Sequence, residues 1–159
     1  MRLSGYVPVD VTPWETASGG KAIACTKQDV CSATVALQRP AGRYDIAVRY
    51  FDYLHGVSTY TLSLNDKIVA EWKADNTLPS DAMNGDTSTR YTLSNIELRP
   101  GDVMKIEGYP NDGEPAPLDY VEITPICTRG RAGAGCRPER KAGGEISLPA
   151  GLSAGKPQA

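Results

Sequence analysis

The chain has 159 residues, 40% of them hydrophobic, which is enough for one folded domain and a modest appendage. Its formal net charge is −2 and its pI about 5.4, so it lacks the basic character of nucleic-acid-binding domains. No apolar run approaches the roughly 18–20 residues of a membrane helix, and the N-terminal stretch lacks the apolar segment of a signal peptide.

The first 42 residues contain short β-prone stretches separated by turn residues. A strand is predicted near residues 6–11 and another at 21–24, followed by the polar connection 26–30. Residues 32–37 predict a further strand, which ends at the proline- and glycine-marked turn 39–42.

The stretch 43–72 shows the clearest alternation of apolar and polar residues in the chain. Residues 44–50, 60–64 and 68–72 each follow the two-residue period of a half-buried strand. The dipeptide at 65–66 is Asn-Asp, whose side chains tolerate left-handed backbone geometry and favour a turn. This stretch therefore predicts three successive antiparallel strands with one dry face and one wet face.

Two long polar segments interrupt the strands that follow. Residues 73–90 predict a loop whose length is typical of functional or disordered segments, and strands are expected at 91–98 and 103–107. A second loop at 109–117 leads into a last strand at 118–125. Short strands separated by turns, without an amphipathic helix, predict an all-β fold: an antiparallel β-sandwich or jelly roll.

The composition changes near the end of the predicted sandwich. Residues 128–159 are rich in Gly, Ala, Pro, Arg and Lys, and they show no core-forming period. We expect a domain at 1–127 and a flexible linker or tail at 128–159.

The four cysteines form two close pairs, Cys25 with Cys31 and Cys127 with Cys136. Neither pair has the C-x-x-C spacing of zinc or redox sites, and the single histidine is remote in sequence. Two short-range disulfides in an extracytoplasmic protein are the favoured interpretation, and four unpaired thiols are the alternative. Three connectivities are possible in principle.

Four local patterns resemble those of a known family. They are the glycine step SGGKA at 18–22, the strand PAGRYDIAVRY at 40–50, the hairpin LSLNDK at 62–67 and the closing strand LDYVEI at 118–123. In this order they resemble carbohydrate-binding modules of families 6 and 35, which have a galactose-binding-like β-sandwich. The resemblance spans about residues 5–125 and leaves the tail outside.

The resemblance implies a function as well as a fold. Such modules are non-catalytic parts of secreted enzymes that degrade plant polysaccharides. We therefore expect an extracellular, monomeric module that binds a polysaccharide or oligosaccharide and is attached to a glycoside hydrolase or lyase domain. Xylan- or pectin-type chains, recognised through uronic acid residues, are the expected ligands.

Sugar recognition needs aromatic platforms and a few polar groups in a cleft that is largely pre-formed. Tyr53, His55, Trp72 and Tyr109 lie in or beside the predicted loops, although the parity of Trp72 fits a core position equally well. Arg90 is suited to pair with a uronate carboxylate. The candidate ligand-binding residues are Tyr53, His55, Trp72, Arg90, Tyr109, Asn111, Asp112 and Glu114. Trp14 is a further aromatic candidate, for ligand contact or for covering one end of the core.

A structural calcium ion is a further implication of the resemblance. These families usually open with paired glutamates, whereas here the comparable stretch is residues 7–10, in which only Asp10 carries a carboxylate. Asp10 and Asp119 in the closing strand are the candidate calcium ligands, since calcium prefers carboxylate and carbonyl oxygens.

Two other functions are open at this stage. A small lyase or hydrolase would need paired carboxylates in one cleft, and Asp112 with Glu114 is the only compact pair of this kind in the predicted loops. The sequence shows no nucleophile elbow or zinc-protease motif. The other alternative is a structural sandwich that packs against its parent enzyme and binds no sugar.

Overall fold

The computed structural model describes residues 1–13, 16–126 and 144–147. These residues form β-strands and one 3-10 turn, η2 (Ser18–Gly20). The strands are β1 (Arg2–Ser4), β2 (Val7–Asp10), β3 (Lys21–Ala24), β4 (Cys31–Ala36), β5 (Gly42–Phe51), β6 (Thr59–Leu64), β7 (Lys67–Lys73), β8 (Ser88–Leu98), β9 (Val103–Tyr109), β10 (Leu118–Pro125) and β11 (Gly144–Ser147). In this described part, no helix is long and apolar enough to span a membrane.

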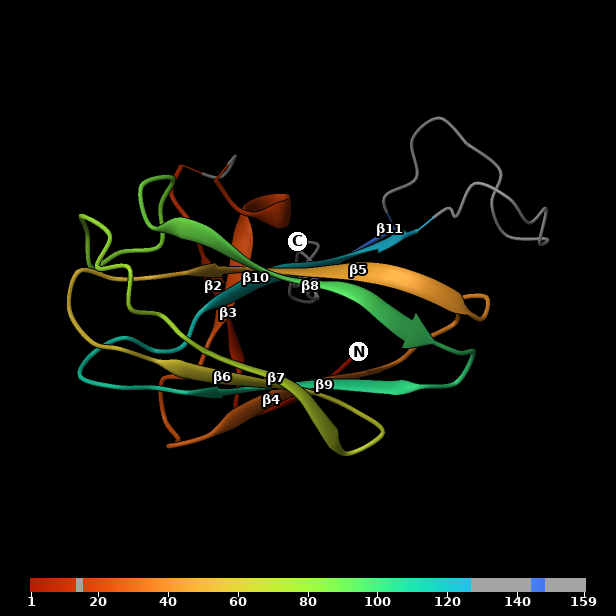
Figure 1. Ribbon diagram of the computed structural model, residues 1–159. Helices are drawn as coiled ribbons and strands as arrows, with labels where there is room; N and C mark the ends of the chain where they lie inside the picture. Colours follow the sequence, from red (N-terminus) through yellow and green to blue (C-terminus); the bar gives the residue numbers. More distant parts are fainter. Residues whose placement is uncertain (14–15, 127–143, 148–159) are drawn as a thin grey trace, which may run out of the picture.

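The strands form two antiparallel sheets that lie one above the other (Figure 1). The five-stranded sheet has the order β1-β4-β9-β6-β7. The six-stranded sheet has the order β2-β3-β10-β5-β8, and β11 also pairs with β10. The all-β antiparallel sandwich predicted from the alternating sequence is thus confirmed.

The apolar positions of the alternating strands face the space between the two sheets. On β5, Ile46 and Val48 are fully buried, while the intervening Ala47 and Arg49 are partly exposed. Tyr60 and Leu62 on β6 are also fully buried and belong to the same core cluster. The two-residue period therefore predicted the inner face of these strands correctly.

The predicted hairpin between β6 and β7 is confirmed, including its backbone geometry. Asn65 and Asp66 both have positive φ angles, 49° and 64°. The Asn65 side chain also links the turn to the neighbouring strand, because its Oδ1 accepts a hydrogen bond from the Val103 amide at 2.8 Å. Two consecutive left-handed residues match the right-handed twist of the flanking strands.

The first predicted strand, near residues 6–11, corresponds to β2, and a further strand that the sequence did not predict, β1, precedes it in the other sheet. β1 pairs with β4, whereas β2 pairs with β3, so the chain changes sheets between Ser4 and Val7. Gly5 makes this change with φ +78°, and a Cβ there would lie 2.7 Å from the Cys31 sulfur. Glycine is thus required both by the φ angle and by the close approach.

A second, smaller core cluster lies at the other surface of the six-stranded sheet. Phe51 is fully buried there against Val11, Ala17, Ala22 and Tyr53. The N-terminal segment between β2 and β3 therefore covers part of the outer face of this sheet. Trp14, for which we predicted a covering or ligand-binding role, lies outside the described residues.

The disulfide between Cys25 and Cys31 is confirmed, with the two Cα atoms 5.7 Å apart. It closes the connection between β3 and β4. Cys127 and Cys136 lie outside the described residues, so their pairing stays a prediction. Most of the predicted tail is outside them too, but Gly144–Ser147 forms β11 against Tyr120–Ile123 of β10.

Candidate functional site

Four connecting segments meet at one end of the sandwich, at the left in Figure 1, and we call this end the loop face. They are residues 25–30, 52–58, 74–87 and 110–117. Backbone hydrogen bonds join them: Leu54 N donates to Ser80 O at 2.9 Å, and Cys25 N donates to Pro115 O at 2.8 Å. Both long polar loops predicted from the sequence therefore come together in space.

Glu114 is the buried centre of the loop face. Its side chain is fully buried, and its two oxygens accept hydrogen bonds from the amides of Tyr53 at 2.7 Å and Ser58 at 3.0 Å. Burial raises the pKa of Glu114, and the hydrogen bonds from Tyr53 and Ser58 act in the opposite direction. Its oxygens are engaged with backbone amides, so the structure places Glu114 as a support of the loops, not as the exposed ligand contact that we predicted.

The 74–87 loop is ordered by polar side chains that turn inward. Fully buried Asp52 accepts hydrogen bonds through Oδ2 from the Asn76 amide at 3.0 Å and from Asn76 Nδ2 at 2.8 Å. The hydroxyl of buried Thr87 donates to Ala82 O at 2.7 Å. These contacts fix a segment whose sequence alone was consistent with disorder.

A hollow of about 390 Å³ opens on the loop face. Asn111 and Asp112 lie on its wall, and both are exposed. Asn111 Oδ1 accepts a hydrogen bond from Val57 N at 3.1 Å, while Asp112 has a positive φ of 44° at the tip of the turn. The residues that line it are Cys25, Thr26, Pro110, Asn111, Asp112, Gly113, Glu114 and Pro115.

His55 joins two loops of the loop face through Asp81. Its amide donates to Asp81 Oδ1 at 2.9 Å, and its Nδ1 lies 2.8 Å from Asp81 Oδ2. The hydrogen bond that Asp81 accepts from the ring raises the pKa of the His55 imidazole, and the same bond lowers the pKa of Asp81. Both side chains are exposed, so the predicted surface position of His55 is confirmed.

The predicted aromatic platforms are mostly buried. Trp72 is 6% exposed and stacks between Tyr60 and Tyr91, with ring centroids 5.2 and 4.5 Å away. Tyr53 is also 6% exposed, and its burial raises its pKa to about 12. Our prediction that these two rings face a ligand is therefore wrong. Tyr109 is partly buried at the end of β9 and is not among the residues that line the hollow.

The two predicted calcium ligands each face a basic side chain. Asp10 is exposed and forms an ion pair with Lys21 at 2.5 Å. Asp119 is fully buried, accepts a hydrogen bond from the Ser18 amide at 2.8 Å and lies 3.6 Å from Arg49 Nε. In the described residues no group of three or more acidic, histidine or cysteine side chains is arranged to hold a metal ion. Calcium binding therefore stays an untested prediction.

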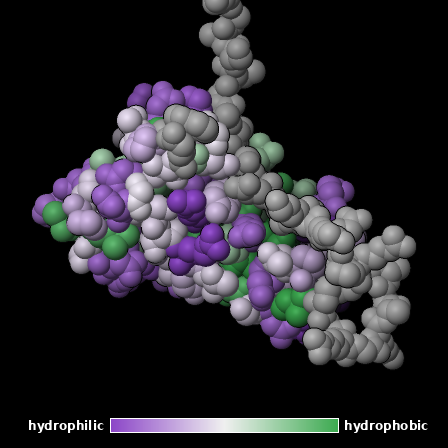
Figure 2. Space-filling model, turned by 90° about the horizontal axis from the view of Figure 1, so that it is seen from above, coloured by the Kyte–Doolittle hydropathy of each residue, from purple (hydrophilic) through white to green (hydrophobic). Residues whose placement is uncertain are grey.

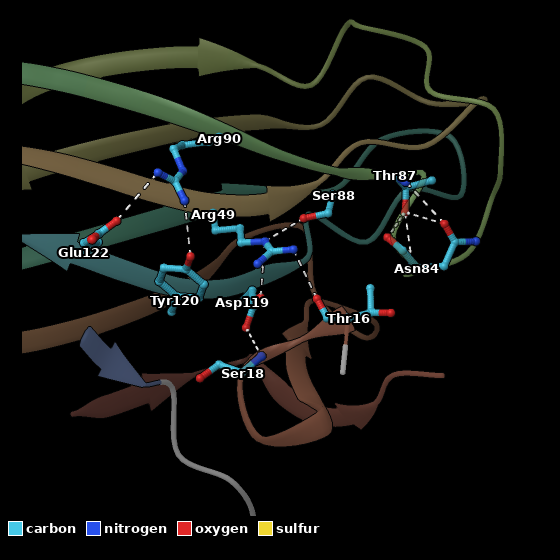
Figure 3. Close-up of polar contacts among 10 residues, drawn as sticks. All are labelled: Thr16, Ser18, Arg49, Asn84, Thr87, Ser88, Arg90, Asp119, Tyr120 and Glu122. Atoms are coloured by element: carbon cyan, nitrogen blue, oxygen red, sulfur yellow. Dashed lines mark hydrogen bonds and ion pairs between the residues drawn. The ribbon is translucent and has the colours of Figure 1, made fainter. Parts of the chain in front are cut away.

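Arg90 lies away from the loop face hollow, on the outer face of the six-stranded sheet (Figure 3). Its Nη2 donates to the Tyr120 hydroxyl at 3.3 Å, and its Nη1 lies 3.6 Å from Glu122. Arg49 is its register partner on β5. The structure therefore separates Arg90 from the other predicted ligand-binding residues.

No family model matches the chain. It is 43% identical over 131 residues to a probable alpha-glucuronidase A of Aspergillus oryzae, a match that covers 79% of this chain and 16% of that protein. The alpha-glucuronidase A of Aspergillus tubingensis is 40% identical over 132 residues, with the same coverage. The chain thus spans 16% of the length of the curated relatives that it matches.

Solved structures resemble the sandwich itself. A family 35 carbohydrate-binding module from Clostridium thermocellum superposes with a TM-score of 0.57 at 14% identity, over 79% of this chain and 92% of that one. The chain has the fold of a family 35 carbohydrate-binding module. The Podospora anserina GH26-CBM35 β-(1,4)-mannanase gives a TM-score of 0.52 at 18% identity, over 81% of this chain and 26% of that one.

The sequence did not single out several exposed residues on the loop face and on the outer face of the six-stranded sheet. Leu54 and Val57 expose apolar side chains on the loop face, 43% and 38% accessible, although isolated apolar residues in a polar loop were a visible signal. Arg49 and Tyr120 lie beside Arg90. Their solvent-facing positions in the alternating pattern of two predicted strands were the only indication that they share a surface with Arg90. Their proximity depends on strand order, which the local pattern does not contain.

Proposed function

We propose that this chain is a non-catalytic saccharide-binding module whose ligand occupies the loop face. The observation that carries the proposal is the hollow between the loops, which combines the exposed polar groups of Asn111 and Asp112 with the apolar surface of Pro110 and Pro115. Saccharide sites combine polar groups that fix the hydroxyls with apolar surface for the sugar ring, in a cleft that exists before binding. The hydrogen bonds beneath the hollow hold it in shape without a ligand.

The alpha-glucuronidase relatives supply the context of the proposal. A match that covers 16% of those proteins supports a module attached to a catalytic glycoside hydrolase domain. We infer that the module is extracellular and monomeric, and that it holds the enzyme on a xylan-type polysaccharide. Tethering of this kind raises the local concentration of substrate at the catalytic domain.

The geometry of the acidic pair supports a non-catalytic role. A glycosidase places two carboxyl groups on opposite sides of the scissile bond, about 5–10 Å apart, with both accessible to substrate. Here Asp112 is exposed, but Glu114 is fully buried and its oxygens accept hydrogen bonds from backbone amides. Both residues line the hollow, but only Asp112 is accessible, so the pair does not offer two exposed carboxylates to a substrate.

Affinity electrophoresis and calorimetry against a panel of xylans, pectins, mannans and β-glucans test the proposal. Asp112→Gly removes the exposed carboxylate at a positive φ that glycine tolerates, and it should weaken binding. Asp66→Gly is the matched control, since Asp66 is also exposed with positive φ but lies in the hairpin at the other end of β6. Repeating the titration with EDTA shows whether a metal ion contributes.

Three outcomes would contradict the proposal. Equal loss of affinity in both variants would show that the loop face is not the site. No interaction with any polysaccharide would favour the structural-sandwich alternative. Release of reducing sugar by the isolated chain would show that it is catalytic.

A further inference from the structure

Hydrophilic residues gather near the centre of the outer face of the six-stranded sheet, which Figure 2 shows from above. Asp119 of β10 belongs to this sheet, and its side chain is fully buried. Its Oδ1 accepts a hydrogen bond from the Ser18 amide at 2.8 Å, and its Oδ2 lies 3.6 Å from Nε of Arg49 (Figure 3). An ionised carboxylate is stable away from water only when a positive charge or hydrogen-bond donors accompany it. Arg49 supplies that positive charge.

The guanidinium of Arg49 also connects segments that are far apart in the sequence. Its Nε donates to Ser88 Oγ of β8 at 2.6 Å. Its Nη2 donates to Thr16 O, in the segment between β2 and β3, at 3.2 Å. The Tyr120 ring lies against the guanidinium, with its centre 5.7 Å from Cζ, and adds a cation–π contact. Together with Asp119 on β10, these contacts make one side chain of β5 a cross-link between four parts of the chain.

The oxygens around Arg49 are of the kinds that a calcium ion also binds. Calcium takes six to eight oxygen ligands, mostly carboxylates and carbonyls. Here the Asp119 carboxylate and the Thr16 carbonyl already face one guanidinium. Arginine is always charged in proteins, so a divalent ion among these oxygens would be repelled by a neighbouring positive charge. Further carboxylates would be needed to offset that repulsion.

The strand β2 does not supply those carboxylates. It contains the stretch 7–10, where the resemblance predicts paired glutamates, and it is separated from β10 only by β3. Val9 instead packs against the second core cluster. The one carboxylate of the stretch, Asp10, is exposed and forms an ion pair with Lys21. The surroundings of Asp119 therefore suit a guanidinium better than a divalent ion.

We propose that the Arg49 guanidinium is the structural cation of this module and takes the place of the calcium ion that the resemblance implies. It neutralises Asp119 and holds β5, β8, β10 and the segment between β2 and β3 together. Because this cation is part of the chain, the stability of the fold does not depend on the calcium concentration.

Thermal unfolding in excess EDTA and in millimolar calcium chloride tests the independence from calcium. The two melting temperatures should agree within about 1 °C, because an ion that binds the folded chain would raise the melting temperature by mass action. A calcium-dependent rise that Asp119→Asn abolishes would overturn the proposal. A rise that Asp119→Asn leaves intact would place an ion elsewhere and would still support Arg49 as the cation at Asp119.

Replacement of Arg49 tests its role as the cation. Arg49→Gln leaves the buried carboxylate of Asp119 without its counter-charge and should lower the melting temperature by about 5–15 °C. Arg90→Gln is the matched control, because it removes the same charge from the neighbouring strand of the same sheet. The Arg90 side chain is 50% exposed and lies 3.6 Å from Glu122, so its loss should cost less than about 3 °C. Equal falls in the two variants would reduce the effect to net charge and overturn the proposal.

The double variant Arg49→Gln with Asp119→Asn separates a coupled pair from two independent residues. Asparagine removes the buried charge that requires the guanidinium, so the double variant should melt no lower than Arg49→Gln alone. If Arg49→Gln does not fold, the double variant should recover a folded protein for the same reason. A double variant that shows the sum of the two single losses, or that stays unfolded, would overturn the proposal.

Discussion

Replacement of Glu114 by alanine should strongly destabilise the protein, although this carboxylate makes no ion pair in the described residues. In the native chain its oxygens accept the amides of Tyr53 and Ser58 at 2.7 and 3.0 Å, and the side chain is fully buried. Alanine leaves both amides without an acceptor, and each unsatisfied buried donor costs about 1–3 kcal/mol.

The two donors together give a range of about 2–6 kcal/mol. Because Glu114 lines the loop-face hollow, water can reach part of the space that alanine leaves, and we expect about 2–4 kcal/mol. With a urea m-value of about 2 kcal/mol/M, the midpoint of unfolding should fall by about 1–2 M. Glu114→Gln keeps one acceptor oxygen and should give a smaller loss.

Urea unfolding followed by far-UV circular dichroism measures this change. Asp112→Asn is the control, since this exposed neighbour tolerates its positive φ as asparagine and should change the stability by less than about 0.5 kcal/mol. A midpoint for Glu114→Ala equal to that of Asp112→Asn would refute the reasoning, because the two amides would then have no need of the carboxylate.

The pH dependence of the stability of the same variants tests the pKa shift of Glu114. Burial raises the pKa of Glu114 above its ordinary value of 4.5, so the folded protein binds this proton more tightly than the unfolded chain. The resulting stabilisation is complete below pH 4.5 and is lost as the pH rises through the folded-state pKa. The stability of the native protein relative to Glu114→Gln should therefore decrease as the pH rises, and an increase would contradict the pKa shift.

Three further changes test other parts of the fold. Trp72→Ala should lower the free energy of unfolding, measured in urea, by about 3–5 kcal/mol. Trp72→Phe should keep its saccharide affinity in calorimetry. A folded Trp72→Phe protein without affinity would show that the Trp72 ring contacts the ligand. Gly56→Ala should destabilise the protein more than Gly101→Ala. Both glycines have φ +88°, but only a Cβ at position 56 would meet a backbone oxygen, at 2.4 Å. Equal melting temperatures of the two variants would show that this clash does not occur. Replacing Cys25 and Cys31 together by alanine should cost about 2 kcal/mol, the chain entropy of a short closed loop, and an unchanged unfolding midpoint would disprove this.

The loops show where local pattern ceases to predict structure. Alternate residues such as Asp112 and Glu114 were expected to share the surface, yet a pair of backbone hydrogen bonds between Asn111 and Glu114 closes the turn and directs Glu114 inward. The parity of Trp72 allowed core or platform, and the facing tyrosines of the two sheets decided for the core. The contacts that hold these side chains inward come from other strands and loops: the amides of Tyr53 and Ser58 bind Glu114, and the rings of Tyr60 and Tyr91 stack on Trp72.

The sequence by itself determined most of the strands and the Asn65–Asp66 turn, and it favoured the Cys25–Cys31 disulfide. These features depend on neighbours within a few residues: a two-residue period of burial, the left-handed tolerance of two side chains and a short loop between thiols. Tertiary structure alone decided which loops form the loop face and brought Arg49 beside Arg90. Strand order and register arise from contacts between segments far apart in the chain, and alternation leaves these open.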